Sequence, residues 1–343
     1  MNESTMSEHA YLLRLINGFM ASRAVHMAAE LAIADLLSDG TRTSEDLARE
    51  TGTDPASLHR LLRVLTSLGV LEETSPGHFA LTKMGYALRS DVTGSLRDFA
   101  LMSGGERMWR IWGDLLRSIQ TGEPATPRLY GVESFDYFAA HPAEAAIFNR
   151  AMANVTHQAT RAVVATCDFT RFHEVVDVGG GNGALMAGIL AAVPALKGIV
   201  FDLPSGMDDA QRQLQAAGVA DRCEVVAGDF FHSVPVADAY ILKSVTHDWD
   251  DPRATAILRS CRTAMPPHGT LLLIERVMPE RMEMSTRNQR MATLDLHMLV
   301  GPGGRERTEA EFKEILARSG FAWTSTSPLP GELGLSVIEG RPV

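Results

Sequence analysis

His247 is a residue whose surroundings could support chemistry. It follows a hydrophobic run, AYILK (239–243), and is flanked by Asp248, Trp249, Asp250 and Asp251. Three interpretations are open: a metal ligand beside carboxylates, a catalytic base, or a histidine that is satisfied at the end of a strand. Ligands at successive residues rarely converge on one ion, and the sequence offers no second set of ligands, so we expect no metal.

A glycine-rich segment, VVDVGGGNGA (175–184), is the second candidate. Its alternating glycines Gly179, Gly181 and Gly183 stand between a β-rich run and a helical run. Glycine permits a sharp turn and close approach of a ligand, and the following helix presents free N–H groups. This is typical of a nucleotide cofactor site at the carboxyl end of a first strand. The spacing Gly179-x-Gly181-x-x-Ala184 also fits a relaxed dinucleotide fingerprint, so NAD stays open at this point.

Acidic residues at the ends of three β-rich runs separate the possible cofactors. Asp177, just before the first glycine, would repel a pyrophosphate but suits the ammonium and sulfonium groups of S-adenosylmethionine. Asp202 ends GIVFD and can accept both ribose hydroxyls. Gly228, Asp229 and Phe230 end the third run, where a carboxylate can take the adenine amine and a ring can cover the base. Each aspartate could instead cap a helix, but the three in order favour S-adenosylmethionine.

The elements that carry these residues alternate in type after residue 172. The β-rich runs EVVDVG, GIVFDLP, CEVVAGD, AYILK and TLLLIERV are mostly separated by helical segments. This alternation predicts a parallel sheet covered on both faces. We expect a catalytic domain over residues 166–343, with the boundary near residue 165.

Residues 1–165 are predicted to be almost wholly helical. The stretch from Tyr11 to Leu37 is too apolar for a lone surface helix, so we expect it to be buried, against another subunit. Thr43 and Asp46 have capping-box spacing, Gly69 follows a leucine-rich helix, and residues 70–82 predict a hairpin. This pattern of helix-turn-helix plus wing fits DNA binding or a packing scaffold. Lys/Arg and Asp/Glu are equally frequent over residues 40–90, which favours the scaffold.

Composition indicates two globular domains. The 343 residues are 45% hydrophobic and 22% charged, which is typical of such domains. The net charge of −10 disfavours a nucleic-acid partner. Three scattered cysteines predict neither a disulfide framework nor a zinc site. The polar start MNESTMSEHA lacks the order of a signal peptide, and Pro194 and Lys197 interrupt the longest apolar region, so we expect a cytoplasmic protein without a membrane span.

Six motifs together carry a family resemblance: DVGGGNG, FDLP, GDFF, LKSVTHDWDD, LLLIERVMPE and GPGGRERT. With them the chain resembles, over nearly its whole length, the plant caffeic-acid-type O-methyltransferases and their bacterial relatives that act on phenolic natural products. The resemblance implies a Rossmann-like α/β methyltransferase domain with a mixed seven-stranded sheet. An all-helical winged-helix dimerisation domain would precede it and contribute a lid to the substrate pocket. It also implies S-adenosylmethionine as cofactor, no metal, and a homodimer with swapped N-terminal domains.

The family's functional residues transfer by motif position. The catalytic histidine falls on His247, and its two acidic supporters fall on Glu275 and Glu306. The cofactor residues fall on Asp202, Asp229 and, on the adenine side, Lys243. Two positions depart from the plant pattern: Phe230 replaces methionine over the adenine, and Thr246 replaces leucine, which makes the edge of the pocket more polar.

A base is useful to this chemistry because a phenol has a pKa near 10. At pH 7 only about one molecule in a thousand is ionised, a deficit of roughly 4 kcal/mol. A histidine can remove the proton as methyl transfer begins, and a carboxylate on its far nitrogen fixes the tautomer. From the residues alone, Glu306 between Arg305 and Arg307 fits a solvated salt-bridge loop equally well.

The acceptor pocket should be apolar, lined by methionines and aromatic residues at helical spacing. The candidates are Phe148, Met152, Met291, Leu294 and Met298, with Trp109 as a lid. Such stripes are more often plain core than pocket, and the set does not point to one substrate.

We therefore predict an S-adenosylmethionine-dependent O-methyltransferase that methylates a phenolic hydroxyl of a small secondary metabolite. One alternative is the same fold with different chemistry, such as decarboxylation or hydroxylation, and the intact set of His247, Glu275 and Glu306 argues against it. A second alternative is a ligand-sensing, DNA-binding regulator, and the acidic charge balance argues against that.

Overall fold

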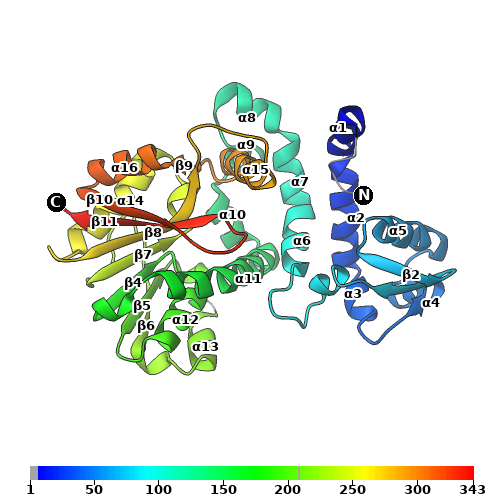
Figure 1. The fold of residues 1–343 in the computed structure, drawn as a ribbon, viewed down its shortest axis with the longest axis horizontal. Helices are drawn as coiled ribbons and strands as arrows, with labels where there is room; N and C mark the ends of the chain where they lie inside the picture. Colours follow the sequence, from blue (N-terminus) through cyan, green and yellow to red (C-terminus); the bar gives the residue numbers. More distant parts are fainter. Residues whose placement is uncertain (1–6, 208) are drawn as a thin grey trace. The chain divides into compact units, whose positions relative to one another are not determined.

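The computed structural model describes residues 7–207 and 209–343, which form two compact units (Figure 1). The first unit runs to Trp109 and includes Ala146–Asn154; the second comprises Arg110–Ala145 and Val155–Val343. These limits differ from the predicted boundary near residue 165. The reason is that the last turns of a long helix, including Ala159 and Val163, are part of the core of the second unit.

Helices make up most of the first unit, although it is not all-helical as the resemblance implies. Its helices are α1 (Glu8–Ile16), α2 (Gly18–Glu30), α3 (Ile33–Leu36), α4 (Ser44–Thr51), α5 (Pro55–Ser67), the 3₁₀ helix η2 (Gly85–Leu88), α6 (Arg97–Gly104) and the first half of α7 (Glu106–Gly113). Three short strands, β1 (Arg42–Thr43), β2 (Leu71–Ser75) and β3 (His78–Leu81), form an antiparallel sheet in the order β1-β3-β2.

Local signals in the sequence account for these elements. The hydroxyl of Thr43 accepts a hydrogen bond from the N–H of Asp46 and so caps α4. Gly69 follows α5 with a φ of 77°, the left-handed conformation that ends many helices. Strands β2 and β3 form the hairpin expected over residues 70–82. Leu58, Leu62 and Leu65 of α5 are buried in the core of the unit.

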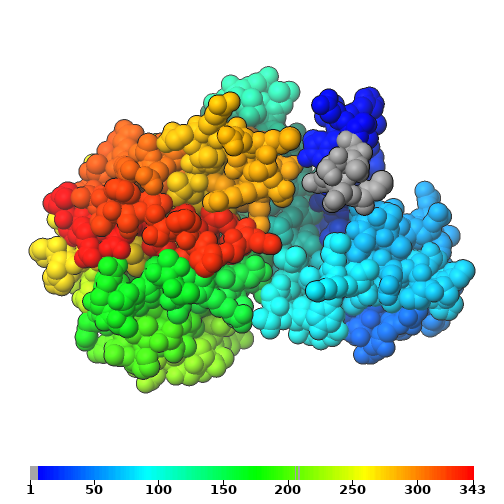
Figure 2. All heavy atoms as spheres, viewed as in Figure 1, coloured from blue at the N-terminus to red at the C-terminus, as the bar shows by residue number. Residues whose placement is uncertain are grey.

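An apolar face of the N-terminal helices is exposed in the single chain. None of the residues of α1 is buried, and Figure 2 shows this helix, in dark blue, at the surface. The exposed apolar side chains of α1 and the start of α2 are Leu12, Leu13, Leu15, Ile16, Phe19 and Met20. A monomer rarely leaves such a contiguous patch in water, so the face is suited to a protein partner.

The second unit is built on one mixed sheet. Its main path runs β10-β11-β8-β7-β4-β5-β6, and the two-residue strand β9 pairs with β8. The strands are β4 (Glu174–Val178), β5 (Lys197–Asp202), β6 (Cys223–Ala227), β7 (Ala239–Lys243), β8 (Thr270–Met278), β9 (Arg307–Thr308), β10 (Phe321–Pro328) and β11 (Leu335–Pro342). Strands β4 to β8 are parallel, and β10 and β11 are antiparallel, which agrees with the predicted mixed sheet.

Helices cover both faces of this sheet, as the alternation predicts (Figure 1). The helices of the unit are α8 (Leu115–Thr121), α9 (Ala125–Tyr130), α10 (Ser134–Ala140), α11 (Pro142–Thr166, whose middle belongs to the first unit), α12 (Ala184–Ala192), α13 (Ala210–Ala216), α14 (Asp251–Ala264), α15 (Thr286–Val300) and α16 (Glu309–Arg318). Short 3₁₀ helices are η3 (Phe169–Arg171), η4 (Pro204–Gly206), η5 (Ala220–Arg222) and η6 (Thr246–Asp248).

Alternate residues of each strand enter two separate cores. Val175 of β4 packs with residues of α11, α12 and α13, whereas Val176 packs with residues of α14 and α16. Because β4, β5, β6, β7 and β8 are parallel, their carboxyl ends meet at one edge of the sheet. Ligand sites in such folds lie at this edge, and the predicted site residues lie at or just beyond these strand ends.

Candidate active site

His247 lies in the turn η6 that follows strand β7. The strand ends at Lys243, and Ser244 adopts a left-handed φ of 53°, which is uncommon for a residue with a side chain and turns the chain away from the sheet. Lys243 is paired with Ile274 of the neighbouring strand β8, so Glu275 comes level with the turn. Parallel pairing of two strands therefore brings His247 and Glu275 together.

Glu275 holds the backbone of this turn. Its Oε1 atom accepts hydrogen bonds from the N–H groups of Val245 (3.0 Å) and Thr246 (2.8 Å) and from the hydroxyl of Thr246 (2.7 Å). Its Oε2 atom lies 3.7 Å from Nδ1 of His247. The Glu275 side chain is fully buried, so its charge acts through a medium of low dielectric. Thr246, which departs from the family pattern, thus holds the turn and is itself buried.

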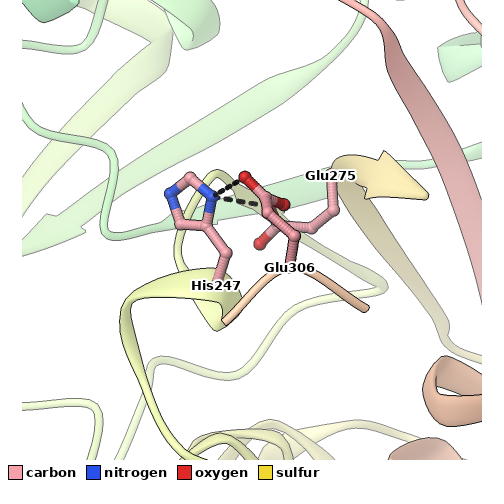
Figure 3. A group of neighbouring side chains, drawn as sticks. All are labelled: His247, Glu275 and Glu306. Carbon is pink, nitrogen blue, oxygen red and sulfur yellow. Dashed lines mark hydrogen bonds and ion pairs between the residues drawn. The ribbon is translucent and has the colours of Figure 1, made fainter. Parts of the chain in front are cut away.

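Glu306 reaches the same ring nitrogen from the loop that precedes β9. Its Oε1 atom lies 3.1 Å from Nδ1 of His247, and Figure 3 shows both carboxylates on one side of the imidazole. The N–H of Glu306 donates to Asp295 of α15 at 2.8 Å, which fixes its backbone. Glu306 is buried and Arg307 is fully buried, so the interpretation of this stretch as a solvated salt-bridge loop is wrong for both residues. Arg305 alone is partly exposed.

Opposing effects set the charge of the imidazole. Burial lowers the pKa of His247, but the nearby carboxylates of Glu275, Asp248 and Glu306 outweigh it and raise the pKa from 6.5 to about 9. Asp248 Oδ1 lies 3.6 Å from Nε2, on the other side of the ring. Burial also raises the pKa of Asp248, to about 6, despite the favourable charge of His247. In the free protein the ring is therefore mostly protonated at pH 7.

The glycine segment forms a tight loop between β4 and α12. Gly179, Gly181 and Gly183 all have φ values between 53° and 72°, a region that side chains disfavour. A Cβ atom on Gly179 would lie 2.8 Å from Cγ2 of Val245, so the loop packs directly against the turn that carries His247. The N–H of Gly181 donates to Asp202 at 2.7 Å, which ties the loop to the end of β5.

Two segments of the chain match known domains. Residues 112–322 match an O-methyltransferase domain, and residues 13–91 match an O-methyltransferase dimerisation domain. The chain belongs to the O-methyltransferase family. This dimerisation domain supports a homodimer, and it includes most of the exposed apolar face of α1 and α2.

Relatives of this O-methyltransferase act on several acceptors. It is 45% identical to a phenazine O-methyltransferase of Lysobacter antibioticus, over 97% of this chain and 96% of the relative. It is 36% identical to an 8-amino-8-demethylriboflavin N,N-dimethyltransferase of Streptomyces davaonensis, over 87% and 85% of the two chains. A solved O-methyltransferase from neocarzinostatin biosynthesis, in complex with S-adenosylmethionine and 2-hydroxy-5-methyl naphthoic acid, matches with a TM-score of 0.81 and 34% identity, over 94% and 96% of the chains. The protein is thus an S-adenosylmethionine-dependent methyltransferase.

One predicted cofactor residue, Asp177, fits a cationic ligand at the end of β4. Asp177 is buried, and its Oδ2 atom has no hydrogen-bond partner among the described residues. Burial raises its pKa to about 7, the negative charge of Asp202 adds to the rise, and Lys243 opposes it. A positively charged ligand would lower this pKa and supply the missing partner. The buried carboxylate is therefore compatible with the ammonium or sulfonium of S-adenosylmethionine.

The other cofactor residues divide between the two sides of β4. Asp229 and Phe230 follow β6, and the ring of Phe230 packs edge-on against Phe231 and Trp249. Lys243 ends β7, which lies on the other side of β4, next to β8. Burial lowers the pKa of Lys243, and Asp177 and Glu275 oppose that shift. Lys243 therefore ends the strand next to the one that carries Asp177, and its place beside the adenine stays a prediction.

The predicted pocket residues fall in both units. Met291, Leu294 and Met298 lie on α15 in the second unit, and Phe148, Met152 and Trp109 belong to the first. Met291 and Met298 are buried, and they lie four residues before and three residues after Asp295, on the same face of α15. Because Asp295 binds Glu306, this face is tied to the catalytic cluster.

Several contacts near the site were not predicted from the sequence. Phe135 of α10 stacks on Trp249 with ring centroids 5.7 Å apart. Trp112 stacks on His297 of α15 and donates a hydrogen bond to its Nδ1 at 3.3 Å. Arg276 contacts Glu306 at 3.5 Å. Phe135, Trp112 and His297 lie outside the six motifs, which is why motif matching alone misses them, whereas Trp249 and Arg276 lie inside two of the motifs.

A cation would fit the three catalytic side chains by distance alone. Ligand atoms of His247, Glu275 and Glu306 lie within 4.8 Å of one another. However, one oxygen of Glu275 already accepts three hydrogen bonds, and the guanidinium of Arg276 contacts Glu306. The absence of a metal remains a prediction. Separately, none of the helices in the described residues has the length and hydrophobicity that a membrane span requires.

Proposed function

We propose that this protein methylates a phenolic hydroxyl of a small, flat aromatic secondary metabolite, with His247 as general base. The observation that carries the proposal is the buried pair of His247 and Glu306, held against the glycine loop. A buried imidazole bonded to a carboxylate at one nitrogen is the arrangement that activates a hydroxyl in other enzymes.

The hydrogen bonds give each side chain a role. The neutral ring donates its Nδ1 proton to Glu306, which leaves the lone pair of Nε2 available for the proton of the acceptor. Glu275 holds the turn by its backbone and adds negative charge that stabilises the imidazolium formed in the reaction. Glu306 therefore orients the base, and Glu275 positions the segment that carries it.

The proposed reaction is a direct transfer. S-adenosylmethionine supplies a methyl group bound to a sulfonium. The bond from the phenolic oxygen to the methyl carbon forms as the carbon–sulfur bond breaks, and the products are a methyl ether and S-adenosylhomocysteine. The phenolic proton passes to Nε2 of His247 and then to solvent. No metal takes part in these steps.

The base favours oxygen over aromatic nitrogen as the acceptor atom. One relative, a phenazine-1-carboxylate N-methyltransferase of Pseudomonas aeruginosa, is 30% identical over 98% of this chain. A ring nitrogen has a free lone pair and no proton to lose, so a base adds nothing to its methylation. A phenol gains about three orders of magnitude in reactive form when its proton is removed at pH 7. The buried set of His247, Glu275 and Glu306 is therefore of use mainly to a hydroxyl acceptor.

The acceptor should be a fused aromatic ring system. Two of the relatives named for their substrates act on a phenazine and on a hydroxylated naphthoate, which have fused rings, whereas a third acts on a single-ring hydroxybenzoate. The face of α15 that carries Met291 and Met298 offers flexible, polarisable walls to such rings. Shape and the position of the hydroxyl relative to His247 would select the substrate.

A panel of acceptors with isotopically labelled methyl donor tests the function. It should contain hydroxyphenazines, dihydroxynaphthoic acids, simple phenols and phenazine-1-carboxylate, with products identified by mass. Methylation confined to hydroxyls supports the proposal, and methylation of ring nitrogen only would overturn it.

Replacement of the base tests the mechanism. His247→Ala should lower turnover at pH 7 by roughly 10²–10⁴ while cofactor affinity stays within about threefold. Between pH 7 and 9 the neutral imidazole of the native protein and the phenolate in solution increase together, so the loss should stay nearly constant. Above about pH 9 it should shrink, and at any pH it should be smaller for more acidic phenols, because the solvent then supplies phenolate. His268→Ala, at an exposed histidine before β8, is the matched control and should behave like the native protein. The base role fails if His247→Ala keeps near-normal turnover at pH 7, or if its loss is the same at every pH and acceptor acidity.

A further inference from the structure

We propose that Arg307 is a positioning residue that holds the turn carrying His247 at hydrogen-bond distance from Glu306. The inference rests on the proposed role of His247 as base. Arg307 adjoins Glu306 in the chain, yet its side chain faces the backbone on either side of His247. It thus links the two segments that must meet for the imidazole and its carboxylate to pair.

The contacts of the guanidinium are unusually complete. Nη1 donates to the carbonyl of Thr246 at 2.8 Å, and Nη2 donates to the carbonyl of Trp249 at 2.8 Å. Nε and Nη2 both donate to one carboxylate oxygen of Asp251, at 2.9 and 2.8 Å. The side chain has a relative exposure of 0%, so these partners replace all of its water. Thr246 and Trp249 bracket His247, and Asp251 is the first residue of α14.

Neighbouring residues show that the two segments lie directly against each other. The N–H of Arg305 donates to the carbonyl of His247 at 2.8 Å. A Cβ atom on Gly304 would lie only 2.0 Å from that same carbonyl oxygen, so no larger residue fits there. Glu275 already binds the N–H and hydroxyl of Thr246 from the other side. Arg307 binds the carbonyl of the same residue, Thr246, so hydrogen bonds hold the turn on both sides.

The shape of the guanidinium matters to this role. A planar fork can donate to two carbonyls and a carboxylate at once, whereas a lysine ammonium is a compact charge that cannot span them. Without Arg307 the buried carbonyls of Thr246 and Trp249 would each lose their strong donor. The turn would relax, and Glu306 would lose its fixed distance from Nδ1 of His247. A displacement of about 1 Å at a catalytic group can lower a rate by about 10²-fold.

The histidine's own titration reports this geometry independently of turnover. The charged groups that face the ring are Glu275 from β8, Asp248 from its own turn, and Glu306, with Arg276 of β8 behind it. Of these, Glu306 is the one whose distance depends on Arg307. If Glu306 moves away, the imidazolium loses a stabilising charge and a hydrogen bond, which lowers the pKa of His247. Loss of the positive charge of Arg307 acts in the opposite direction, so a lower pKa reports the movement of Glu306 and not the change of charge.

The experiment compares Arg307→Met and Arg307→Lys with the native chain. NMR of ¹⁵N-histidine-labelled protein gives the pKa of His247, and kinetics give kcat and both KM values. For Arg307→Met we expect a pKa lower by about one unit, a kcat lower by about 10–100-fold, and a dissociation constant for S-adenosylmethionine within threefold. Arg307→Lys should recover only part of both effects, because an ammonium group can donate to some of these partners but cannot span all of them.

Arg253→Met is the matched control. Arg253 also lies beside the turn, over the ring of Trp249 and paired with Asp250, but it donates to none of the carbonyls around His247 in the described contacts. Its loss should leave the titration of His247 unchanged. The same downward shift in Arg253→Met as in Arg307→Met would overturn the proposal, since removal of any arginine beside the turn would then produce it; loss of positive charge by itself should raise the pKa of His247.

Two further measurements distinguish a positioning role of Arg307 from a loss of folding and from a failure of the proposed base mechanism. Thermal melting and cofactor binding show whether Arg307→Met folds. If it does not fold, Asp251→Asn is the substitute variant, because it weakens the anchor of the guanidinium with little change in shape. Asp251→Asn should lower the pKa of His247 by less than Arg307→Met. The positioning role is overturned if the pKa of His247 in a folded Arg307 variant equals that of the native protein. If no Arg307 variant folds, the same result in Asp251→Asn overturns it. A shifted titration combined with an active His247→Ala variant would support positioning and reject only the base.

Discussion

Nδ1 of His247 lies 3.1 Å from Oε1 of Glu306, although 59 residues separate the two in the chain. The pair is buried, and Arg276 contacts the same carboxylate oxygen at 3.5 Å. Burial opposes ionisation of Glu306, but the hydrogen bond and charge of His247, together with the charge of Arg276, lower the pKa of this carboxyl below its usual value. Glu306 is thus an anion that fixes the ring and favours its protonated form.

This pairing with Glu306 should raise the pKa of His247. A general base acts in its neutral form, so with a folded-state pKa of about 9 the active form grows as pH rises through that value. In Glu306→Gln the imidazolium loses one negative partner, so the midpoint should move to lower pH by about one unit. Turnover at high pH should still fall, because the ring is less well oriented. NMR titration of the free protein together with pH–rate profiles checks this; equal midpoints in the two proteins would contradict it.

Asp202→Ala should weaken the binding of S-adenosylmethionine. A carboxylate that accepts the ribose hydroxyls contributes about 1.5–3 kcal/mol, so calorimetry should show roughly 10–150-fold lower affinity. Asp202 also accepts the N–H groups of Gly181 and Leu203, and its loss could act through the loop. S-adenosylhomocysteine and its 2′-deoxy analogue separate the two effects. If the mutation lowers the affinity for both ligands by the same factor, Asp202 shapes the loop and does not bind the ribose.

Turnover should survive chelation. Glu275 Oε1 is occupied by three donors, and Arg276 places a positive charge beside Glu306, so a dication would displace existing partners. Rates measured after treatment with EDTA, and again with added magnesium, check the expectation. Loss of activity that magnesium restores would reassign His247, Glu275 and Glu306 as metal ligands.

Charge placed on α1 should weaken the homodimer. Leu12 and Ile16 are exposed and lie one turn apart on the same face of the helix. The double variant Leu12→Glu, Ile16→Glu introduces like charges that would meet across a two-fold interface, so light scattering should show a shift toward monomer. Val236→Glu, at an exposed position in the second unit, is the control. A double variant that stays dimeric at low micromolar concentration would place the interface elsewhere.

Much of the fold follows from short-range patterns in the sequence. Alternation of β-rich and helical segments predicts the parallel strands β4 to β8, because such strands need helical crossovers on both faces. Thr43, Gly69 and the hairpin over residues 70–82 are predicted correctly since caps and turns depend on a few adjacent residues. The boundary of the second unit does not follow from such short-range patterns. Residues 155–165 belong to this unit because their apolar side chains pack in its core.

The sequence also identifies the candidate site residues: Asp177, Asp202 and Asp229 follow from strand ends and a glycine turn, which mark the edge where ligands bind. The assignments of Glu275, Glu306 and Lys243 rest on the family resemblance. Their arrangement required the tertiary structure. Pairing of β7 with β8 sets Glu275 beside His247, and the loop before β9 brings Glu306 and the buried Arg307 to the same turn. Lys243 lies beside Asp177 and Glu275 because of the order of strands across the sheet, which no single strand encodes. The raised pKa of His247 likewise depends on burial and on carboxylates from distant segments, since electrostatic interactions act across space and not along the chain.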